Sequence, residues 1–349
     1  MFKPKWSWKF FPARLNLDSA TSMPTQQSDE ISHSPRTRIP SAALVPLAFA
    51  GVYILWGSTY LGIRVAIETF PPLVMAAIRH SIVGLILYPA LRWKTGIRPS
   101  AAQWRTAAVT GVLLLCVSNG GLSWAESRVP SGVASLLVAT VSVWLIILEW
   151  LRPGGSRPLP RVVAGLIVAF AGLFLLVGPA RLGGAGRIDL LGAAVLTLAS
   201  ISWAFGSIYS KHGRMVSSPL LGVAMQSLCG AAALWIVAAA SRETQGFHLA
   251  AVSTRSWIAL GYLLVFGSGL GFTSYIYILQ KSTPAKVGTY AFINPMVALF
   301  LGWSLGGEVI TTRTLLAAVI ILLAVVLVVT ASWRSAGILK KTLPATEEA

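Results

Sequence analysis

Long runs of apolar residues, separated by short polar segments, cover most of the chain from residue 43 onward. A run of about 20 apolar residues is long enough to cross a bilayer as an α-helix. The connections are short, and many of them contain Gly or Pro. The pattern predicts an all-α membrane protein without a separate soluble domain. Its ten expected spans are residues 43–66, 72–92, 104–124, 130–150, 160–178, 188–209, 217–240, 256–279, 285–305 and 312–332.

Two short motifs occur twice, in the same order and about 150 residues apart. Trp56-Gly57-Ser58-Thr59-Tyr60 returns as Trp203-Ala204-Phe205-Gly206-Ser207-Ile208-Tyr209, and Pro130-Ser131-Gly132-Val133 returns as Pro284-Ala285-Lys286-Val287. Each half contains five expected spans, and an odd number makes the second half enter the membrane from the opposite face. We therefore predict two inverted five-helix repeats, residues 42–179 and 188–333. Polar cytoplasmic tails, 1–41 (expected to be disordered) and 334–349, flank them.

Composition supports a membrane protein. Apolar residues make up 55% of the 349 residues, charged residues make up 11%, and the mean hydropathy is +0.72. Soluble domains carry about 25% charged residues. The net charge of +17 is dispersed between the apolar runs and indicates membrane topology, so no nucleic-acid partner is expected. Cys116 and Cys229 both lie within expected spans, which leaves no disulfide framework, metal cluster or cofactor site.

The distribution of Lys and Arg predicts the orientation, because cytoplasmic loops carry an excess of both residues. With the N-terminus in the cytoplasm, 20 basic residues fall on the inner side. The seven outer residues are Arg64, Arg128, Arg181, Arg187, Arg242, Arg255 and Arg313. We expect a multi-pass protein of the cytoplasmic (inner) membrane with both termini in the cytoplasm.

The repeated motifs resemble those of the drug/metabolite transporter superfamily, specifically its ten-helix EamA-domain exporters. The resemblance covers residues 43–332. It implies two five-helix bundles around a central cavity and export of small metabolites (amino-acid-like) or drugs, without naming the cargo. The resemblance rests on the segments Ile54-Leu55-Trp56-Gly57-Ser58-Thr59-Tyr60, Ala125-Glu126, Val129-Pro130-Ser131-Gly132, Ile201-Ser202-Trp203-Ala204-Phe205-Gly206-Ser207, Tyr290-Ala291-Phe292-Ile293-Asn294-Pro295 and Gly306-Gly307-Glu308.

Aromatic and polar side chains on and near these motifs are candidates to line the cavity and bind a small-molecule substrate. Aromatic faces bind apolar or cationic groups, and hydroxyl groups both donate and accept hydrogen bonds. The alternative for each residue is helix packing, and a serine can instead bond to its own helix backbone. The candidates are Trp56, Ser58, Tyr60, Asn119, Ser131, Trp203, Ser207, Tyr209, Ser274, Tyr290 and Asn294.

Asn294 precedes Pro295 inside the ninth expected span. Proline removes a backbone donor and frees a carbonyl in the preceding turn, and in lipid that carbonyl needs protein or water. We therefore expect a kink beside a wet cavity, with Asn294 pointing into it. Asn119, followed by Gly120-Gly121, is a similar position in the third span. For both asparagines an interhelical hydrogen bond is the alternative.

Arg79 is the one basic residue well inside an expected span. An intramembrane charge is costly, so it should face protein or water and have a partner. Glu126, at the outer end of the third span, is a candidate for that partner. We expect an outer Arg79–Glu126 gate latch, mirrored inside by a neutral contact between Gln226 and Gln280. A static structural ion pair is the alternative.

Acidic residues are missing from the middle of every expected span. Glu68, Glu126, Glu149, Asp189 and Glu308 all lie near span ends. A buried carboxylate relay for protons is therefore not evident, which favours facilitated diffusion or exchange and leaves coupling through Glu126 open.

Other function classes fit the sequence less well. Only His80 of the four histidines lies within a span, and the chain has no intramembrane metal or catalytic motif, so an enzyme is not expected. A channel would need a filter or a charged ring. A small-molecule sensor, a lipid flippase or an importer with the same fold is the alternative to an exporter working by alternating access. Apart from the substrate and the lipid bilayer, the partners stay open, a homodimer among them.

Overall fold

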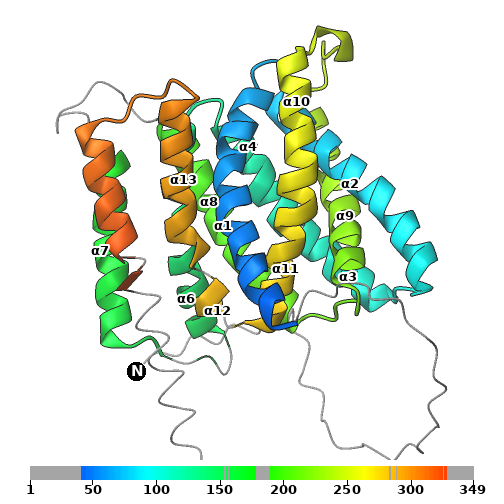
Figure 1. Ribbon diagram of the computed structural model, residues 1–349, viewed down its shortest axis with the longest axis horizontal. Helices are drawn as coiled ribbons and strands as arrows, with labels where there is room; N and C mark the ends of the chain where they lie inside the picture. The colour runs from blue at the N-terminus through cyan, green and yellow to red at the C-terminus, as the bar shows by residue number, and fades with distance from the viewer. Residues whose placement is uncertain are drawn as a thin grey trace, which may run out of the picture.

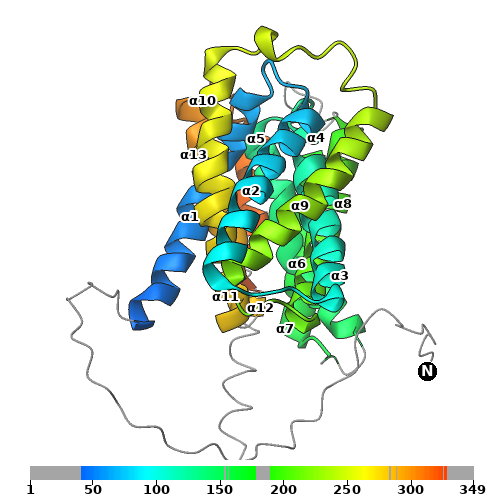
Figure 2. The same ribbon diagram turned by 90° about the vertical axis from the view of Figure 1, so that its right-hand side faces the viewer.

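The structure is a computed structural model that describes residues 41–152, 155, 157–177, 189–282, 284–287, 289–324 and 326–327. All regular secondary structure in these ranges is helical. The longer helices stand side by side as one bundle in two perpendicular views (Figures 1 and 2). The expected tails, apart from Ser41, lie outside the described residues.

The first half begins with α1 (Ser41–Ala66) and α2 (Pro72–Thr95). A continuous helical segment follows, made of α3 (Ala101–Thr110), the π-helix η1 (Gly111–Gly120) and α4 (Gly121–Ala125). The fourth expected span is broken at Thr140 into α5 (Ser131–Ala139) and α6 (Val141–Leu151), and α7 (Pro160–Val177) completes this half.

The second half begins with α8 (Leu190–His212) and α9 (Pro219–Ala240), followed by the short 3-10 helix η3 (Leu249–Ala251). Its third segment is again continuous and contains α10 (Thr254–Tyr262), the π-helix η4 (Leu263–Gly271) and α11 (Phe272–Lys281). The short α12 (Pro284–Val287) and α13 (Tyr290–Ser304) come next, and the last helical segment is Thr312–Ala324.

Within the described residues, seven helices are long and apolar enough to cross a membrane. They fall on the first to fourth and the sixth to eighth expected spans. Shorter apolar helices at Pro160–Leu176, Ile293–Ser304 and Thr312–Ala324 lie within the other three. The prediction of a multi-pass all-α protein therefore agrees with the structure, whereas ten membrane crossings and inverted topology stay predictions.

Local sequence explains several helix ends. Ser100 and Gln103 form a reciprocal capping box at the start of α3, in which each side chain accepts from the other residue's backbone N–H. The side chain of Asp189 accepts from Gly192 N at the start of α8. Gly96 ends α2 with φ of 64°, a conformation that glycine adopts without steric cost.

Small residues bring helices of the two halves into close contact. Gly111 of η1 faces Gly230 of α9, and a Cβ at Gly111 would lie 2.5 Å from the backbone oxygen of Gln226. A Cβ at Gly230 would lie 2.8 Å from the backbone oxygen of Gly111. Helices in membranes pack through such small residues, because lipid supplies no hydrophobic drive between them. The two glycines therefore set the separation between η1 and α9.

The outer surface of the bundle carries large apolar side chains. Leu85, Ile236, Ile258 and Phe300 are each more than 60% exposed. Exposed apolar side chains spread over several helices of one bundle are expected where the surrounding solvent is lipid. The bundle interior, by contrast, contains the buried polar residues from which the candidate site is built.

Candidate functional site

A central cavity of about 70 Å³ lies between the helices of both halves. A cavity of this size has room for a few water molecules or a small ligand group. Helices α1, α2, α4, α5, α8, α11 and α13 and the two π-helices all contribute to its wall. The lining residues are Trp56, Thr59, Tyr60, Arg79, His80, Leu115, Ser118, Asn119, Leu122, Val138, Trp203, Gly267, Ser268, Phe272, Tyr290 and Asn294.

An aromatic cluster forms one part of the wall. The ring of Trp56 meets that of Trp203 edge-on at 5.3 Å between centroids, and it meets Tyr290 edge-on at 5.7 Å. The ring of Tyr275 also packs on Trp56, with 4.9 Å between the ring centroids. The Tyr275 hydroxyl accepts a hydrogen bond from Trp203 Nε1 at 3.1 Å. Edge-to-face geometry at these separations is favourable. The cluster therefore presents rigid apolar faces to the cavity.

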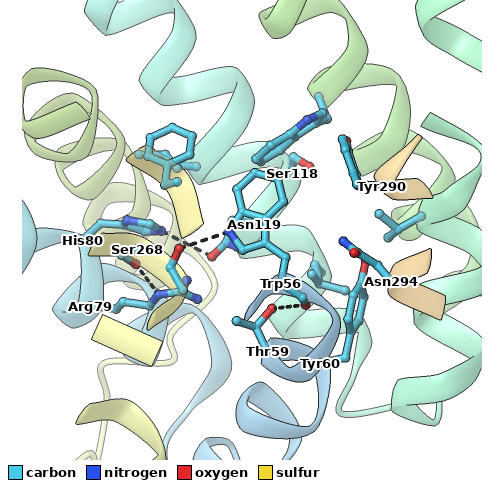
Figure 3. Close-up of a pocket in the computed structure, with 16 residues that line it drawn as sticks. Trp56, Thr59, Tyr60, Arg79, His80, Ser118, Asn119, Ser268, Tyr290 and Asn294 are labelled. Atoms are coloured by element: carbon cyan, nitrogen blue, oxygen red, sulfur yellow. Dashed lines mark hydrogen bonds between the residues drawn. The ribbon is translucent and has the colours of Figure 1, made fainter. Parts of the chain in front are cut away.

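Polar groups form another part of the wall, on α2, η1 and η4. Arg79 Nε donates to Ser268 Oγ at 2.5 Å, and His80 Nε2 lies 3.3 Å from Asn119 Oδ1. In Figure 3 Arg79, His80 and Ser268 lie to one side of Trp56, and Tyr60, Tyr290 and Asn294 lie to the other. Among the lining residues, three buried polar atoms have no hydrogen-bond partner in the described part of the chain: Arg79 Nη1, His80 Nδ1 and Asn294 Oδ1. The cavity thus has a cationic side and an aromatic side.

Two glycines of η4 make room for this arrangement. A Cβ at Gly267 would lie 2.6 Å from Arg79 Nη2, and a Cβ at Gly271 would lie 2.5 Å from Trp56 Nε1. Trp56 Nε1 donates to the carbonyl of Gly267 at 3.1 Å. The Gly267-Ser268-Gly269 stretch therefore contacts both sides of the cavity directly.

The structure brings together many residues that the sequence singled out. Trp56, Tyr60, Asn119, Trp203, Tyr290, Asn294 and Arg79 all line the cavity. Sequence reasoning missed Thr59, His80, Ser118, Ser268 and Phe272 as lining residues. Thr59 lies within a repeated motif, and His80 and Ser118 adjoin the candidates Arg79 and Asn119, so these three positions were a usable signal. Ser268 and Phe272 had no such signal.

The predicted serines and Tyr209 lie outside the cavity lining. The hydroxyl of Ser58 donates to Leu55 O at 2.9 Å and contacts the Tyr262 hydroxyl at 2.5 Å. Ser207 Oγ donates to Trp203 O at 2.7 Å and contacts the Tyr275 hydroxyl at 2.6 Å. Both serines thus follow the alternative of bonding to their own helix. Three further candidates also lie outside the lining, namely the buried Ser131 and Tyr209 and the half-buried Ser274.

The expected gate contacts are not formed in this structure. Arg79 pairs with Ser268, whereas both carboxylate oxygens of Glu126 lack a hydrogen-bond partner among the described residues. Gln226 is buried and its amide has no partner in the described part of the chain, whereas Gln280 is exposed, so the contact expected between them is not formed either. The physical reason is that η4 packs directly on α2 and supplies Ser268 as the acceptor for Arg79.

Two motifs far apart in sequence meet where α5 begins. Glu308 accepts hydrogen bonds from Ser131 N at 2.7 Å and from Gly132 N at 3.0 Å. Pro130 precedes α5 without supplying a side-chain acceptor, so this carboxylate satisfies backbone donors that the helix start leaves free. The Gly306-Gly307-Glu308 turn therefore holds the Pro130-Ser131-Gly132 turn in place.

Glu126, which follows directly after the third membrane segment, is fully buried. Burial raises the pKa of its carboxyl well above the usual range, nearby Glu308 raises it further, and Arg64 opposes both. Arg64 Nη1 also donates to the backbone oxygen of Glu126 at 2.5 Å. In the part of the chain that is described, no group of His, Cys, Asp and Glu residues could hold a metal ion.

Comparison with known proteins gives a consistent result. Residues 44–178 and 190–330 each match the EamA-like transporter family. The chain is 36% identical over 277 residues to the uncharacterized inner membrane transporter YedA of Escherichia coli strain K12, covering 78% of this chain and 87% of that protein. It is 26% identical to the uncharacterized transporter YvbV of Bacillus subtilis, covering 76% of this chain and 83% of that protein.

A relative from a plant and a solved structure extend this picture. The WAT1-related chloroplastic protein At3g02690 of Arabidopsis thaliana is 24% identical, over 75% of this chain and 64% of that protein. A protein with a crystal structure matches with a TM-score of 0.59 and 18% identity, covering 84% of this chain and 98% of that chain. That structural likeness shows the fold. The two family matches cover most of this chain, which therefore belongs to the EamA-like transporter family.

Proposed function

We propose that this protein is a secondary transporter of the inner membrane that exports small metabolites, amino-acid-like or drug-like, through the central cavity by alternating access. The observation that carries the proposal is the meeting of Trp56 and Trp203 at 5.3 Å in the cavity wall. Trp56 and Trp203 belong to the motif that occurs in both sequence repeats, on α1 and α8 respectively. A substrate site between repeats is the arrangement that secondary transporters use.

Three further features support two inverted repeats of five helices. Both third segments contain a π-helix, η1 and η4, at corresponding places, and such turns are frequent at functional sites. Pro130 and Pro284 both stand at the start of the helix that follows. The family matches the chain twice. We infer that the two halves rock against each other around the cavity.

The proposed orientation has both termini in the cytoplasm, as the excess of inner Lys and Arg predicts. Reporter tags at the two ends, probed with membrane-impermeant reagents on intact cells, test it. Protection of both tags until the cells are permeabilised supports the proposal. Labelling of one tag in intact cells would exclude ten crossings.

Transport itself is tested in two steps. Extracellular metabolites are compared between cells with and without the overproduced protein, and a metabolite that accumulates outside is then tested with purified protein in liposomes. A transporter gives saturable flux and counterflow of labelled substrate. A small-molecule sensor, the alternative function, would bind the metabolite without counterflow.

A further inference from the structure

We propose that the central cavity selects substrates that carry an anionic group, such as a carboxylate, which binds Arg79, attached to an apolar or aromatic body that packs on the Trp56 side. This inference rests on the proposed function and names the substrate class of the same site. It adds a chemical selection rule, since the family resemblance implies only small metabolites or drugs.

The first argument is a buried positive charge without a counter-charge. Arg79 is 3% exposed and lies in α2, within a membrane segment. Its guanidinium has five N–H donors, yet Nε bonds to the neutral Ser268 and Nη1 has no partner among the described residues. No acidic side chain belongs to the cavity lining as described. The guanidinium therefore has at least one N–H donor group without an acceptor, which an anion could supply.

The free-energy cost of burying Arg79 without a counter-charge indicates a functional role for this residue. A buried charge that lacks its partner is strongly destabilising, and ionisable residues within membrane segments mark ligand pathways. The ion pairs found between described residues are Arg128–Asp189, Arg152–Glu149 and Arg255–Glu68. Arg79 is in none of them. A bound anion would supply the counter-charge that the protein itself leaves out.

The second argument is the position of Arg79 in the cavity wall. Gly267 lies directly against the guanidinium, and a Cβ there would approach Arg79 Nη2 to 2.6 Å. The absence of a side chain lets Arg79 occupy the cavity wall (Figure 3). Next to it, His80 Nδ1 has no partner among the residues that the structure describes, and His80 Nε2 lies 3.3 Å from Asn119 Oδ1. Because that amide oxygen accepts, Nε2 donates and the His80 ring is held in place.

The third argument is the opposite wall. Trp56, Trp203, Phe272 and Tyr290 present aromatic rings to the same cavity. Such rings also bind cations, but a cationic ligand in this cavity would face Arg79 without any lining carboxylate to offset the repulsion. A molecule with a negative end and an apolar body can pair with Arg79 and pack on the aromatic rings at the same time. A neutral molecule can only pack on the rings.

The test uses matched probes that differ in charge. Purified protein in lipid nanodiscs is titrated with phenylacetate, phenylacetamide and 2-phenylethylammonium, and with benzoate and hexanoate beside their amides. Binding is measured as a shift of the unfolding midpoint and as competition with labelled exported metabolite. A carboxylate should bind about 10- to 100-fold more tightly than its amide, as hydrogen bonds to charged groups imply.

Variants assign the difference to Arg79. Arg79→Gln should abolish the preference for carboxylate over amide, and Arg79→Lys should retain part of it, since lysine keeps the charge but not the fork of donors. Arg98→Gln, at an exposed position outside the cavity, should change nothing. If Arg79→Gln does not fold, Ser268→Ala provides the second test. It keeps the charge and removes the acceptor of Nε, so the carboxylate preference should persist.

Several outcomes would overturn the proposal. Equal or tighter binding of the amides or of the amine would do so, and so would failure of every carboxylate in the panel. Stabilisation by sodium chloride to the same extent, lost in Arg79→Gln, would assign the site to inorganic anions instead. The proposed function fails separately: carboxylate binding without counterflow would leave the anion site standing and refute transport.

Discussion

Replacing Gly57 by alanine adds one methyl group at a close contact between α1 and α13. A Cβ there would lie 2.6 Å from Val297 Cβ, 2.9 Å from Val297 Cγ1 and 3.3 Å from the backbone oxygen of Asn294. The backbone of Val297 fixes the position of its Cβ, so rotation of the side chain cannot relieve the clash. The two helices must therefore move apart.

The magnitude follows from two opposing effects. Inserting a methyl group into a packed interior costs about 1–3 kcal/mol. Alanine is favoured over glycine inside a helix by about 0.5–1 kcal/mol. We expect Gly57→Ala to lower the free energy of unfolding by about 0.5–2 kcal/mol. Because α1 carries Trp56 and Tyr60 and α13 carries Asn294, the same separation should weaken substrate binding.

The assay is thermal unfolding of the purified protein in detergent, with Gly261→Ala as a matched control. Gly261 lies in α10, and a Cβ there would meet nothing within 4 Å, so this variant should be about 0.5–1 kcal/mol more stable than the parent. Adding Val297→Ala to Gly57→Ala removes Cγ1 but leaves the 2.6 Å contact with Cβ, so it should restore only part of the loss. A Gly57→Ala protein as stable as Gly261→Ala would refute the close contact.

Three further changes test other contacts. Glu308→Gln should lower the free energy of unfolding by about 1.5–3 kcal/mol, because the α5 start loses its carboxylate acceptor; the unfolding midpoint measures this. Tyr275→Phe should cost about 1–3 kcal/mol in the same assay, because Trp203 Nε1 loses its acceptor. Glu126→Gln should flatten the dependence of the midpoint on pH. The raised pKa of Glu126 in the folded protein means that its stabilising contribution is present below the ordinary carboxyl pKa and is lost as pH rises through the folded value.

Each of these predictions has its own control or contradicting result. Glu68→Gln, at a carboxylate whose side chain is 42% exposed, should have a small effect compared with Glu308→Gln. A Tyr275→Phe protein with unchanged stability would mean that the Trp203 indole finds another acceptor. In the pH series, Glu126 is surrounded by Glu308, Arg64 and Tyr60. A midpoint that rises with pH in the parent and not in Glu126→Gln would reverse the sign and contradict burial as the cause.

The helices could be predicted from the sequence because the apolar runs are long and bounded by Gly, Pro and polar residues. The same runs did not reveal the π-helices η1 and η4 or the break at Thr140. Mean hydropathy is taken over a window of about one span. A local change from α-helix to π-helix within a continuous apolar segment therefore leaves the mean hydropathy unchanged. These features depend on how the segment packs on its neighbours.

Lining residues could be predicted where the side chain needs contacts with other helices. The prediction failed where the side chain could bond to its own helix instead. Large aromatic residues such as Trp56 and Trp203 cannot be hidden within their own helix, and both reach the cavity. Serines can bond to their own backbone, and Ser58 and Ser207 do so. Partners that depend on tertiary contact, such as Ser268 for Arg79, could not be read from spacing along the chain.

The most direct test of the central claim is to block the cavity chemically during transport. Cys116 and Cys229 are replaced by alanine, and Ser118→Cys then places a thiol in the cavity wall. The account predicts that a small thiol reagent stops counterflow of the exported metabolite and that excess metabolite slows the modification. The same reagent on Ser127→Cys, an exposed position outside the cavity, should leave flux intact. Undiminished flux after complete modification of the Ser118→Cys protein would contradict the claim that substrate passes through this cavity.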